Sequence, residues 1–184
     1  MWLAVTLCAL GAAACEKKTE GQQSTETAKS KPTKEWWDAA SAGETDKVKS
    51  WLERGVDPNA PNEEGRTALS LASFDGHTDT VRVLLEHGAD PQHRDPAGRT
   101  ALMYAASGRN AQTVRLLLGK APPIDAVDKG EGWTALMFAA AEGQREVVEL
   151  LLQHNANPSI KDTDGETAKD FAMKNGHQEV AELF

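Results

Sequence analysis

The sequence contains three similar versions of one nine-residue segment, at an almost fixed interval. GRTALSLAS occupies residues 65–73, GRTALMYAA occupies residues 98–106 and GWTALMFAA occupies residues 132–140, so the starts lie 33 and 34 residues apart. An interval of about 20 to 50 residues is typical of a repeat array, because each unit is one small element that buries its apolar face against its neighbours. The chain is therefore predicted to be a stacked solenoid rather than a domain around one closed core.

Each unit begins with a turn and a first helix. The turn glycine can adopt a positive φ, and the threonine two residues later can cap the helix that follows. These pairs are Gly65 and Thr67, Gly98 and Thr100, Gly132 and Thr134, and Gly165 and Thr167. Apolar residues then recur at helical spacing. They include a column that is expected to lie in the core, formed by Leu71, Tyr104, Phe138 and Phe171.

A second helix follows in each unit, with a repeated apolar face. Its triplets are Val81, Leu84 and Leu85, then Val114, Leu117 and Leu118, then Val148, Leu151 and Leu152. Gly88 and Asn155 are placed to end two of these helices in the left-handed conformation. Each unit is thus predicted to be a helical pair, and every pair needs a neighbour to cover its apolar side.

From residue 35 onward, these positions together resemble the ankyrin repeat, whose pattern is G-x-T-P-L-H-x-A-A-x-x-G-H-x-x-V-V-x-x-L-L-x-x-G-A-D. The sequence departs from it consistently, with Ala in place of Pro and with Ser or Met in place of His. The resemblance implies an all-α ankyrin-repeat solenoid of about five helix-turn-helix pairs joined by β-turn or hairpin-like loops. The expected units are an N-terminal cap at 35–64, full repeats at 65–97, 98–131 and 132–164, and a C-terminal cap at 165–184.

Two features distinguish individual units. Lys169 stands where the full units have Leu, which suits an outer face at the end of the stack. The second unit is one residue longer, within LGKAPPIDAVDKGE, and Pro122 and Pro123 are expected to reshape its loop.

The N-terminus predicts export. Residues 1–14 are apolar and uncharged, like the core of a signal peptide. The basic residues that usually precede such a core are missing, so either the true start lies upstream of Met1 or the signal is weak. Ala-Ala-Ala before Cys15 resembles a bacterial lipobox, although the family prefers Leu at position 12. The resemblance implies a lipidated Cys15 and, because Glu16 rather than Asp follows, an outer-membrane location. Plain secretion after Ala14 and an uncleaved anchor are the alternatives.

Residues 15–34 are predicted to be a flexible tether, because they contain too few apolar side chains to form a core. The net charge of the chain is -8, and residues 16–34 carry five Lys against three Glu, so the repeat region is strongly acidic. Such a charge disfavours nucleic acid as a partner. A mean hydropathy of -0.51 argues against a membrane-embedded body, so a lipid anchor would be the only membrane contact.

No pattern in the sequence points to catalysis, a metal or a cofactor. The five His are scattered: His77 and His177 occupy a structural position of the repeat, His87 and His154 fall near ends of second helices, and His93 lies in a loop. KDTDGET at 161–167 only faintly resembles a calcium loop, since its Gly comes too early for an EF-hand. We expect a binding protein and not an enzyme.

The family resemblance places partner binding on the loop tips and the exposed side of the first helices. The candidate residues are Glu64, Arg66, Phe74, Asp75, Arg99, Ser107, Glu131, Trp133, Glu142, Glu166 and Lys174. Phe74 and Trp133 are candidate aromatic anchors, or else they pack on neighbouring loops. Arg66 and Arg99 could hold a carboxylate or phosphate, or else form a solvated column balanced by Glu64 and Glu131.

Together these features predict a monomeric interaction module of the bacterial envelope whose partner is another protein. An inhibitor or immunity protein that blocks an enzyme or toxin is the alternative, because it would use the same kind of surface. A hydrolase or metal enzyme is the least favoured hypothesis, since it would need a constellation of residues that the sequence lacks.

Overall fold

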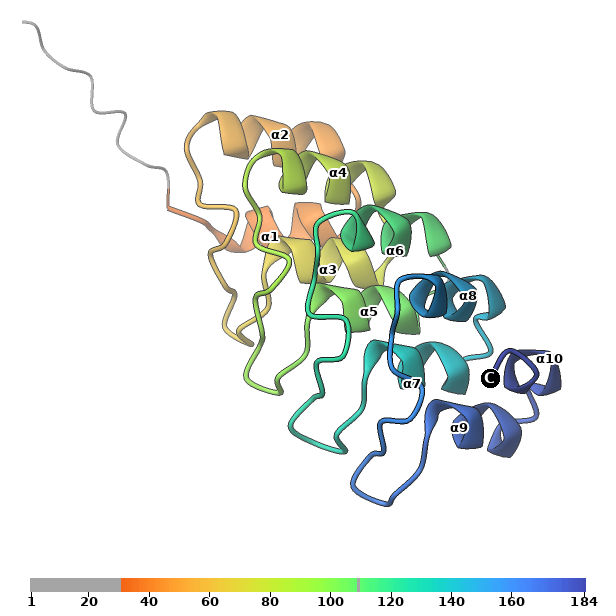
Figure 1. The fold of residues 1–184 in the computed structure, drawn as a ribbon. Helices are drawn as coiled ribbons and strands as arrows, with labels where there is room; N and C mark the ends of the chain where they lie inside the picture. Colours follow the sequence, from red (N-terminus) through yellow and green to blue (C-terminus); the bar gives the residue numbers. More distant parts are fainter. Residues whose placement is uncertain (1–30, 109) are drawn as a thin grey trace, which may run out of the picture.

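The computed structural model describes residues 31–108 and 110–184, which form ten helices in five consecutive pairs (Figure 1). The inner layer consists of α1 (Lys34–Ser41), α3 (Ala68–Phe74), α5 (Ala101–Ser107), α7 (Ala135–Ala141) and α9 (Ala168–Lys174). The outer layer consists of α2 (Thr45–Glu53), α4 (Thr78–Glu86), α6 (Ala111–Leu118), α8 (Arg145–Gln153) and α10 (Gln178–Ala181). These residues contain no strand, which confirms the predicted all-helical solenoid.

Threonine capping starts four of the five inner helices, as predicted. The hydroxyl oxygens of Thr67, Thr100, Thr134 and Thr167 accept the backbone N–H three residues later, at 3.3, 3.3, 3.2 and 3.4 Å. The turn glycine before each threonine has a positive φ, for example 75° at Gly65. Side chains with a Cβ are strained at that angle, so the glycine is needed for the chain to enter the helix.

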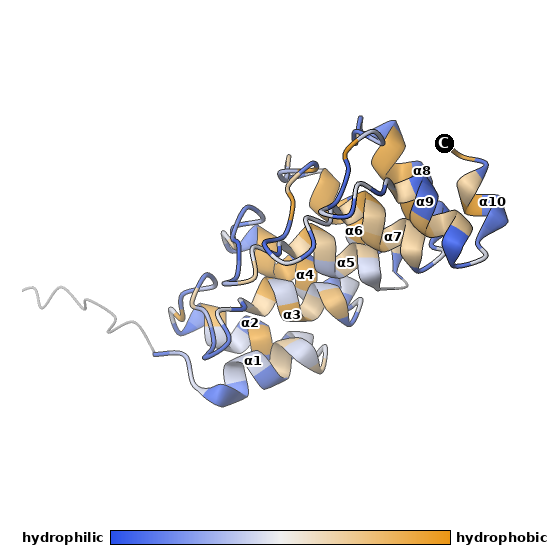
Figure 2. Cartoon of the chain, turned by 90° about the horizontal axis from the view of Figure 1, so that it is seen from below, coloured by the Kyte–Doolittle hydropathy of each residue, from blue (hydrophilic) through white to orange (hydrophobic). Residues whose placement is uncertain are grey.

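The core runs along the whole stack between the two helix layers. Inner helices contribute small side chains that are almost fully buried, such as Ala72, Ala106 and Ala140, and these allow close approach of neighbouring helices. Outer helices contribute Leu84, Leu117 and Leu151, each with no exposed surface. In Figure 2, hydrophobic residues concentrate on the helices and hydrophilic residues predominate in the loops.

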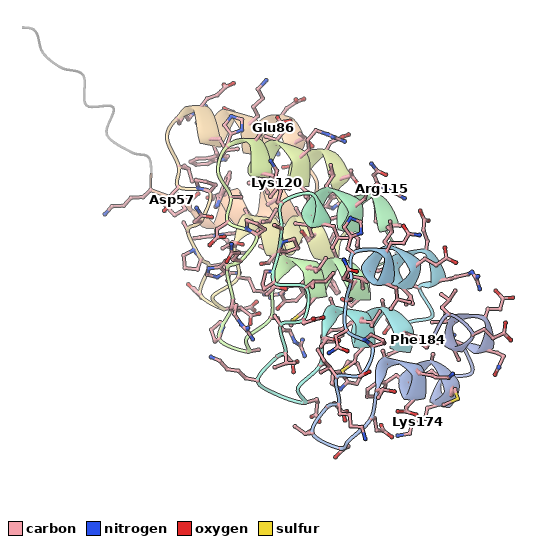
Figure 3. All side chains as sticks on the ribbon, viewed as in Figure 1. Asp57, Glu86, Arg115, Lys120, Lys174 and Phe184 are labelled. Carbon is pink, nitrogen blue, oxygen red and sulfur yellow. The ribbon has the colours of Figure 1, made fainter. Side chains whose placement is uncertain are left out.

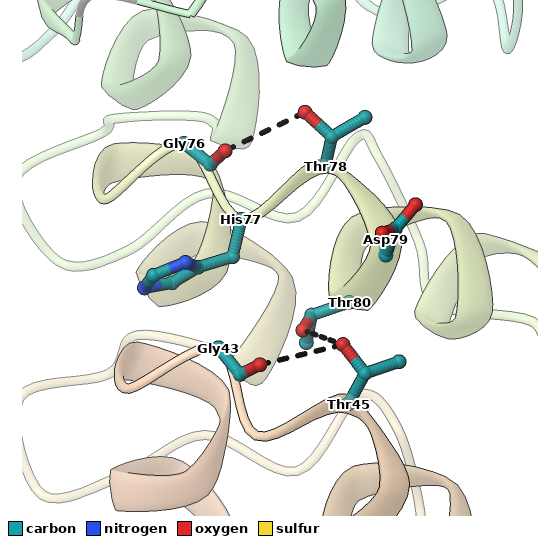
Figure 4. Close-up of a pocket in the computed structure, with 7 residues that line it drawn as sticks. All are labelled: Gly43, Thr45, Gly76, His77, Thr78, Asp79 and Thr80. Carbon is teal, nitrogen blue, oxygen red and sulfur yellow. Dashed lines mark hydrogen bonds between the residues drawn. The ribbon is translucent and has the colours of Figure 1, made fainter.

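Polar contacts between consecutive units add to this packing. His77 Nε2 lies 2.8 Å from the Ser41 carbonyl oxygen, and the hydroxyls of Thr45 and Thr80 lie 2.8 Å apart (Figure 4). His177 repeats the arrangement against the Ala141 carbonyl oxygen at 3.1 Å. Both residues therefore have the structural role expected of them. The polar depression drawn in Figure 4 lies at this junction between units.

The loops that connect each outer helix to the next inner helix project side by side from one edge of the stack (Figure 1). We call them fingers: finger 1 is residues 54–67, finger 2 is 87–100, finger 3 is 119–134 and finger 4 is 154–167. Backbone hydrogen bonds link the tips of fingers 2, 3 and 4, from Lys129 N to the Ala97 carbonyl at 2.8 Å and from Thr163 N to the Glu131 carbonyl at 2.9 Å. The His93 ring of finger 2 contacts the Gly65 carbonyl oxygen of finger 1 at 3.0 Å. The fingers therefore form a connected row.

Finger 3 departs from the others at two points. Its turn runs four residues from Asp128 to Gly132, where the equivalent spacing in finger 2 is three, so the extra residue of this unit lies at the tip rather than beside the prolines. At its base, Ala121 has φ 49°, whereas Gly88 and Asn155 occupy the left-handed position of fingers 2 and 4 as predicted.

The structure describes the C-terminal end of the chain but not residues 1–30. At the C-terminal end, Lys169 is exposed, as expected for the last unit. Within the described residues, no helix combines the length and apolar character needed to cross a membrane. The proposed signal at residues 1–14, Cys15 and the tether up to residue 30 lie outside the described residues.

Candidate functional site

One side-chain oxygen organises the tip of every finger. Oδ1 of Asn62, Asp95, Asp128 and Asp162 accepts backbone N–H groups from the residues that follow, and each contact is between 2.8 and 3.1 Å. Short polar side chains commonly stabilise turns in this way. In finger 4 this turn is the KDTDGET segment, where Asp162 Oδ1 accepts the backbone N–H groups of Asp164 and Glu166 and closes the loop.

In the two middle fingers, the same carboxylates also hold side chains of the inner face. Asp95 and Asp128 are each only 5% exposed. Oδ2 of Asp95 accepts the Tyr104 hydroxyl at 2.6 Å, and Oδ2 of Asp128 accepts Arg99 Nε at 3.3 Å. The turn residue thus fixes both the loop and a neighbouring side chain, which preorganises the surface between fingers 2 and 3.

That surface is a groove between α3, α5 and α7, with a volume of about 250 Å³. It is lined by Phe74, Arg99, Met103, Tyr104, Ser107, Trp133, Phe138 and Glu142. Pockets for whole small molecules are usually larger, about 300 to 1,000 Å³. The groove therefore suits one or two side chains of a larger partner, and half of its lining residues are aromatic.

The two predicted aromatic anchors differ in environment. Phe74 is 51% exposed, and its ring stands at 88° to the ring of Tyr104, with centroids 6.1 Å apart. Trp133 is half-buried and packs on two rings, with centroids 5.0 Å from Phe138 and 4.3 Å from Phe171. Phe74 is thus an open contact, whereas Trp133 is both a wall of the groove and a packing residue.

The aromatic column assigned to the core from the sequence is divided by the structure. Phe171 is 9% exposed, so the assignment holds there. It is wrong for Leu71, Tyr104 and Phe138, which are half-buried on the inner face. Helical periodicity identifies the apolar face of a helix but not how much of it the next unit covers.

The predicted arginine column is already paired within the protein. Arg66 forms an ion pair with Glu64. Arg99 pairs with Asp128 rather than with Glu131, and its Cζ lies 5.3 Å from the centre of the Phe138 ring. A guanidinium held between a carboxylate and an aromatic face is fixed in position. Arg99 is therefore a structured wall of the groove, with 41% of its side chain exposed.

Tyr104 is the groove residue with a strongly shifted acidity. Burial is the main cause, and the hydrogen bond and charge of Asp95 add to it, which together raise the pKa of Tyr104 to about 12. Its hydroxyl consequently stays protonated, and it keeps donating to Asp95 throughout the physiological range.

The remaining predicted residues surround the groove at different distances. Ser107 and Glu142 line it, and no ion pair of the described residues involves Glu142. Asp75 accepts the Ser41 hydroxyl at 2.9 Å, on the side of the preceding unit. Glu131 is exposed at the tip of finger 3, and Glu166 pairs with Lys174 in the last unit. The structure thus gathers Phe74, Arg99, Ser107, Trp133 and Glu142, and leaves the others on the rim or outside.

Five contributors to the groove are not among the predicted site residues: Asp95, Asp128, Met103, Tyr104 and Phe138, of which the last two were expected in the core. The two carboxylates carry a readable signal, because Asn or Asp precedes the turn glycine by three residues in fingers 1, 2 and 4 and by four in finger 3. Met103, which is 2% exposed, stands where the repeat pattern has His.

Histidines and acidic residues do not gather into a metal site in the described part of the chain. His93 contacts the Gly65 carbonyl oxygen at 3.0 Å, and His87 and His154 contact carbonyl oxygens of their own helices at 2.8 Å. These rings are thus engaged in local hydrogen bonds.

Comparison with known proteins agrees with this architecture. The sequence model of a protein family described as ankyrin repeats (three copies) matches residues 36–128 and 110–184. A search of curated proteins finds no match to the chain. Ankyrin repeats generally mediate interactions between proteins, and the match indicates no catalytic family.

Proposed function

The chain belongs to the ankyrin-repeat family, and we propose that it is a non-enzymatic protein-interaction module of the bacterial cell envelope. Its partner is another protein, which it contacts with the fingertips and the inner face of α3, α5 and α7. The observation that carries the proposal is the groove between α3, α5 and α7, where aromatic side chains stand partly open to solvent.

The groove has the properties of an interface centre. Aromatic residues and arginine dominate the binding energy of protein interfaces, especially where they are held in place before the partner arrives. Tyr104 and Arg99 are held by buried carboxylates, and Phe74 is left open beside them. A surface fixed in this way loses little conformational entropy when a partner binds.

The location in the envelope rests on the sequence before the first helix. We propose that residues 1–14 direct export and that Cys15 carries the lipid anchor, at the outer membrane and facing the periplasm. Residues 16–33, which precede α1, would then act as a tether of roughly 25 Å, estimated for a random coil of that length. The repeat domain would reach a partner in the periplasm while the membrane contact stays limited to the lipid.

A pull-down from native envelope extract tests the function. The bait is the full-length chain with a C-terminal tag, and the test variant combines Phe74→Ala with Arg99→Ala. The matched control combines Arg82→Ala with Glu86→Ala on α4; Figure 3 labels Glu86 on the outer helix layer. We expect a protein that is captured by the wild-type chain and the control but not by the groove variant.

Two results would oppose this proposal. Equal capture by both variants would show that the groove is not the contact surface. Loss of capture only in the α4 control would place the contact on the outer layer. If one partner is an enzyme or toxin that loses activity at a one-to-one ratio, the inhibitor role replaces the role of an envelope adaptor.

A further inference from the structure

Charge around the groove is unbalanced in favour of carboxylates. The described residues in and beside the groove include four carboxylates but only two guanidinium groups. The carboxylates are those of Glu64, Asp95, Asp128 and Glu142, and the guanidinium groups are those of Arg66 and Arg99. Each guanidinium is already matched by one carboxylate. The negative charge that remains lies beside aromatic rings, and Glu142 stands exposed at the C-terminal end of α7.

Aromatic faces next to a carboxylate attract cations. The ring quadrupole places negative potential on the face of each ring, and the interaction strengthens when the cation is partly removed from water. The chain itself provides an example in this groove, because Arg99 lies over the Phe138 ring. Phe74 and Tyr104 line the same groove without any cation recorded over their rings in the described residues.

The opposite charge is disfavoured for the same reasons. A carboxylate of a partner would have to compete with Asp128 for Arg99 and with Glu64 for Arg66. It would also approach Glu142, which adds repulsion. Phosphate is disfavoured more strongly, because it carries more negative charge.

We propose that the groove recognises a basic side chain, Lys or Arg, flanked by apolar residues in an extended segment of the partner protein. The basic group lies against Phe74 and Tyr104 with Glu142 as its counter-ion, and the flanking apolar side chains contact Trp133 and Phe138. This inference rests on the proposed protein-binding function and specifies the chemistry of the segment that is bound.

The test uses three peptides, blocked at both ends, of sequence Ala-Leu-X-Leu-Ala, in which X is Arg, Gln or Glu. The full-length chain is titrated with each peptide, and binding is followed through the NMR signals of the Trp133 indole and the backbone of α5. We expect the Arg peptide to bind about fivefold more tightly than the Gln peptide, a gain typical of a partly exposed cation–π contact, and the Glu peptide to bind most weakly.

Two variants separate the contributions. Glu142→Gln should remove most of the preference for Arg over Gln, whereas Glu86→Gln, an equal change of charge on the exposed outer helix α4, should leave it unchanged. Phe74→Leu keeps an apolar side chain but removes a ring, so it should weaken the Arg peptide by about two- to threefold more than the Gln peptide.

Equal binding of the three peptides, or tighter binding of the Glu peptide, would overturn the inference while leaving the groove as a protein-binding surface. Absence of any change at Trp133 and α5 with all three peptides would overturn it as well. The pull-down with the Phe74 and Arg99 variant then decides separately whether the proposed function stands.

Discussion

The four fingers share one turn, but the middle two use it differently from the outer two. In fingers 1 and 4, Asn62 and Asp162 are half-exposed and bond only to the backbone of their own loops among the described contacts. In fingers 2 and 3, Asp95 and Asp128 are buried, and each also holds a side chain of the inner face. The turn residue therefore closes the loop in all four fingers, and it also positions a groove side chain only in fingers 2 and 3.

This difference shows how a repeat can acquire a binding surface while the conformation of its turn stays the same. A carboxylate has two oxygens, and one is sufficient to close the turn. The second oxygen can accept from a neighbouring side chain, which is Tyr104 of α5 for Asp95 and Arg99 of finger 2 for Asp128. Specialisation then needs only the substitution that supplies this donor, while the turn keeps its conformation.

Replacing the turn residue should give the largest difference in stability between a middle finger and an outer finger. Asp128→Ala leaves the N–H groups of Gly132 and Trp133 and the Arg99 guanidinium without their acceptor, which should lower the free energy of unfolding by about 3 kcal/mol. Asp162→Ala should cost only about 1 kcal/mol, because that turn is open to water. Urea denaturation measures both, and Asp128→Asn, which keeps an acceptor, serves as the control. Equal losses in fingers 3 and 4 would contradict the distinction.

The two aromatic anchors, Trp133 and Phe74, should differ in their contribution to the free energy of unfolding, measured in the same experiment. Trp133→Ala removes two ring contacts and should cost about 2 to 3 kcal/mol. Phe74→Ala should cost less than about 1 kcal/mol, because half of that side chain already faces solvent. If Phe74 proved as important to stability as Trp133, it would be a packing residue and a poor candidate for a free contact.

The base of finger 3 offers a change that should stabilise the protein. Ala121 adopts φ 49°, a conformation that costs L-residues roughly 1 kcal/mol and that glycine adopts freely. Ala121→Gly should therefore raise the free energy of unfolding by about 1 kcal/mol, whereas Gly88→Ala at the same position of finger 2 should lower it by a similar amount. Thermal melts of the two variants, compared with wild type, test this symmetry.

The smallest expected effect concerns the proton on Tyr104. Because its pKa in the fold is about 12, above the ordinary value of 10, protonated Tyr104 stabilises the native state fully below pH 10, and this contribution is lost as the pH rises towards 12. The loss should stay below about 1 kcal/mol at pH 11, since the ring is partly exposed. The chain has a single Tyr, so the ultraviolet absorbance of the phenolate reports this residue alone.

Asp95→Asn provides the matched test of that cause. It removes the charge beside the hydroxyl but keeps an acceptor, so the ionisation of Tyr104 should move to lower pH. An unchanged titration would mean that burial alone accounts for the shift and that finger 2 does not tune the groove electrostatically.

Much of the fold could be predicted because its determinants are local and repeated. The threonine caps, the positive-φ glycines and the paired helices each depend on residues within a few positions of one another. Because the nine-residue segment recurs three times, coincidence does not account for its pattern. The groove depends instead on pairs such as Arg99 and Asp128, which lie 29 residues apart in sequence. No periodic pattern shows which of several carboxylates an arginine contacts in the next finger.

The placement of Phe138 and Trp133 illustrates the other limit. The sequence predicts Phe138 in the core and Trp133 either as an exposed anchor or packed on a neighbouring loop, and the structure makes each of them half-buried. Exposure on the inner face depends on how far the next unit is offset, which is a property of the stack and not of one helix. Residues at such a boundary serve stability and binding together.

Site-specific photocrosslinking tests the central claim most directly. Phe74 is replaced by p-benzoylphenylalanine, an aromatic residue of similar shape, and Arg82 on the outer helix α4 of the same repeat receives the same group as control. In native envelopes, the account predicts one discrete protein adduct from position 74 and none from position 82. An adduct at position 82 without one at position 74 would contradict it, because the partner would then contact the outer layer and not the groove.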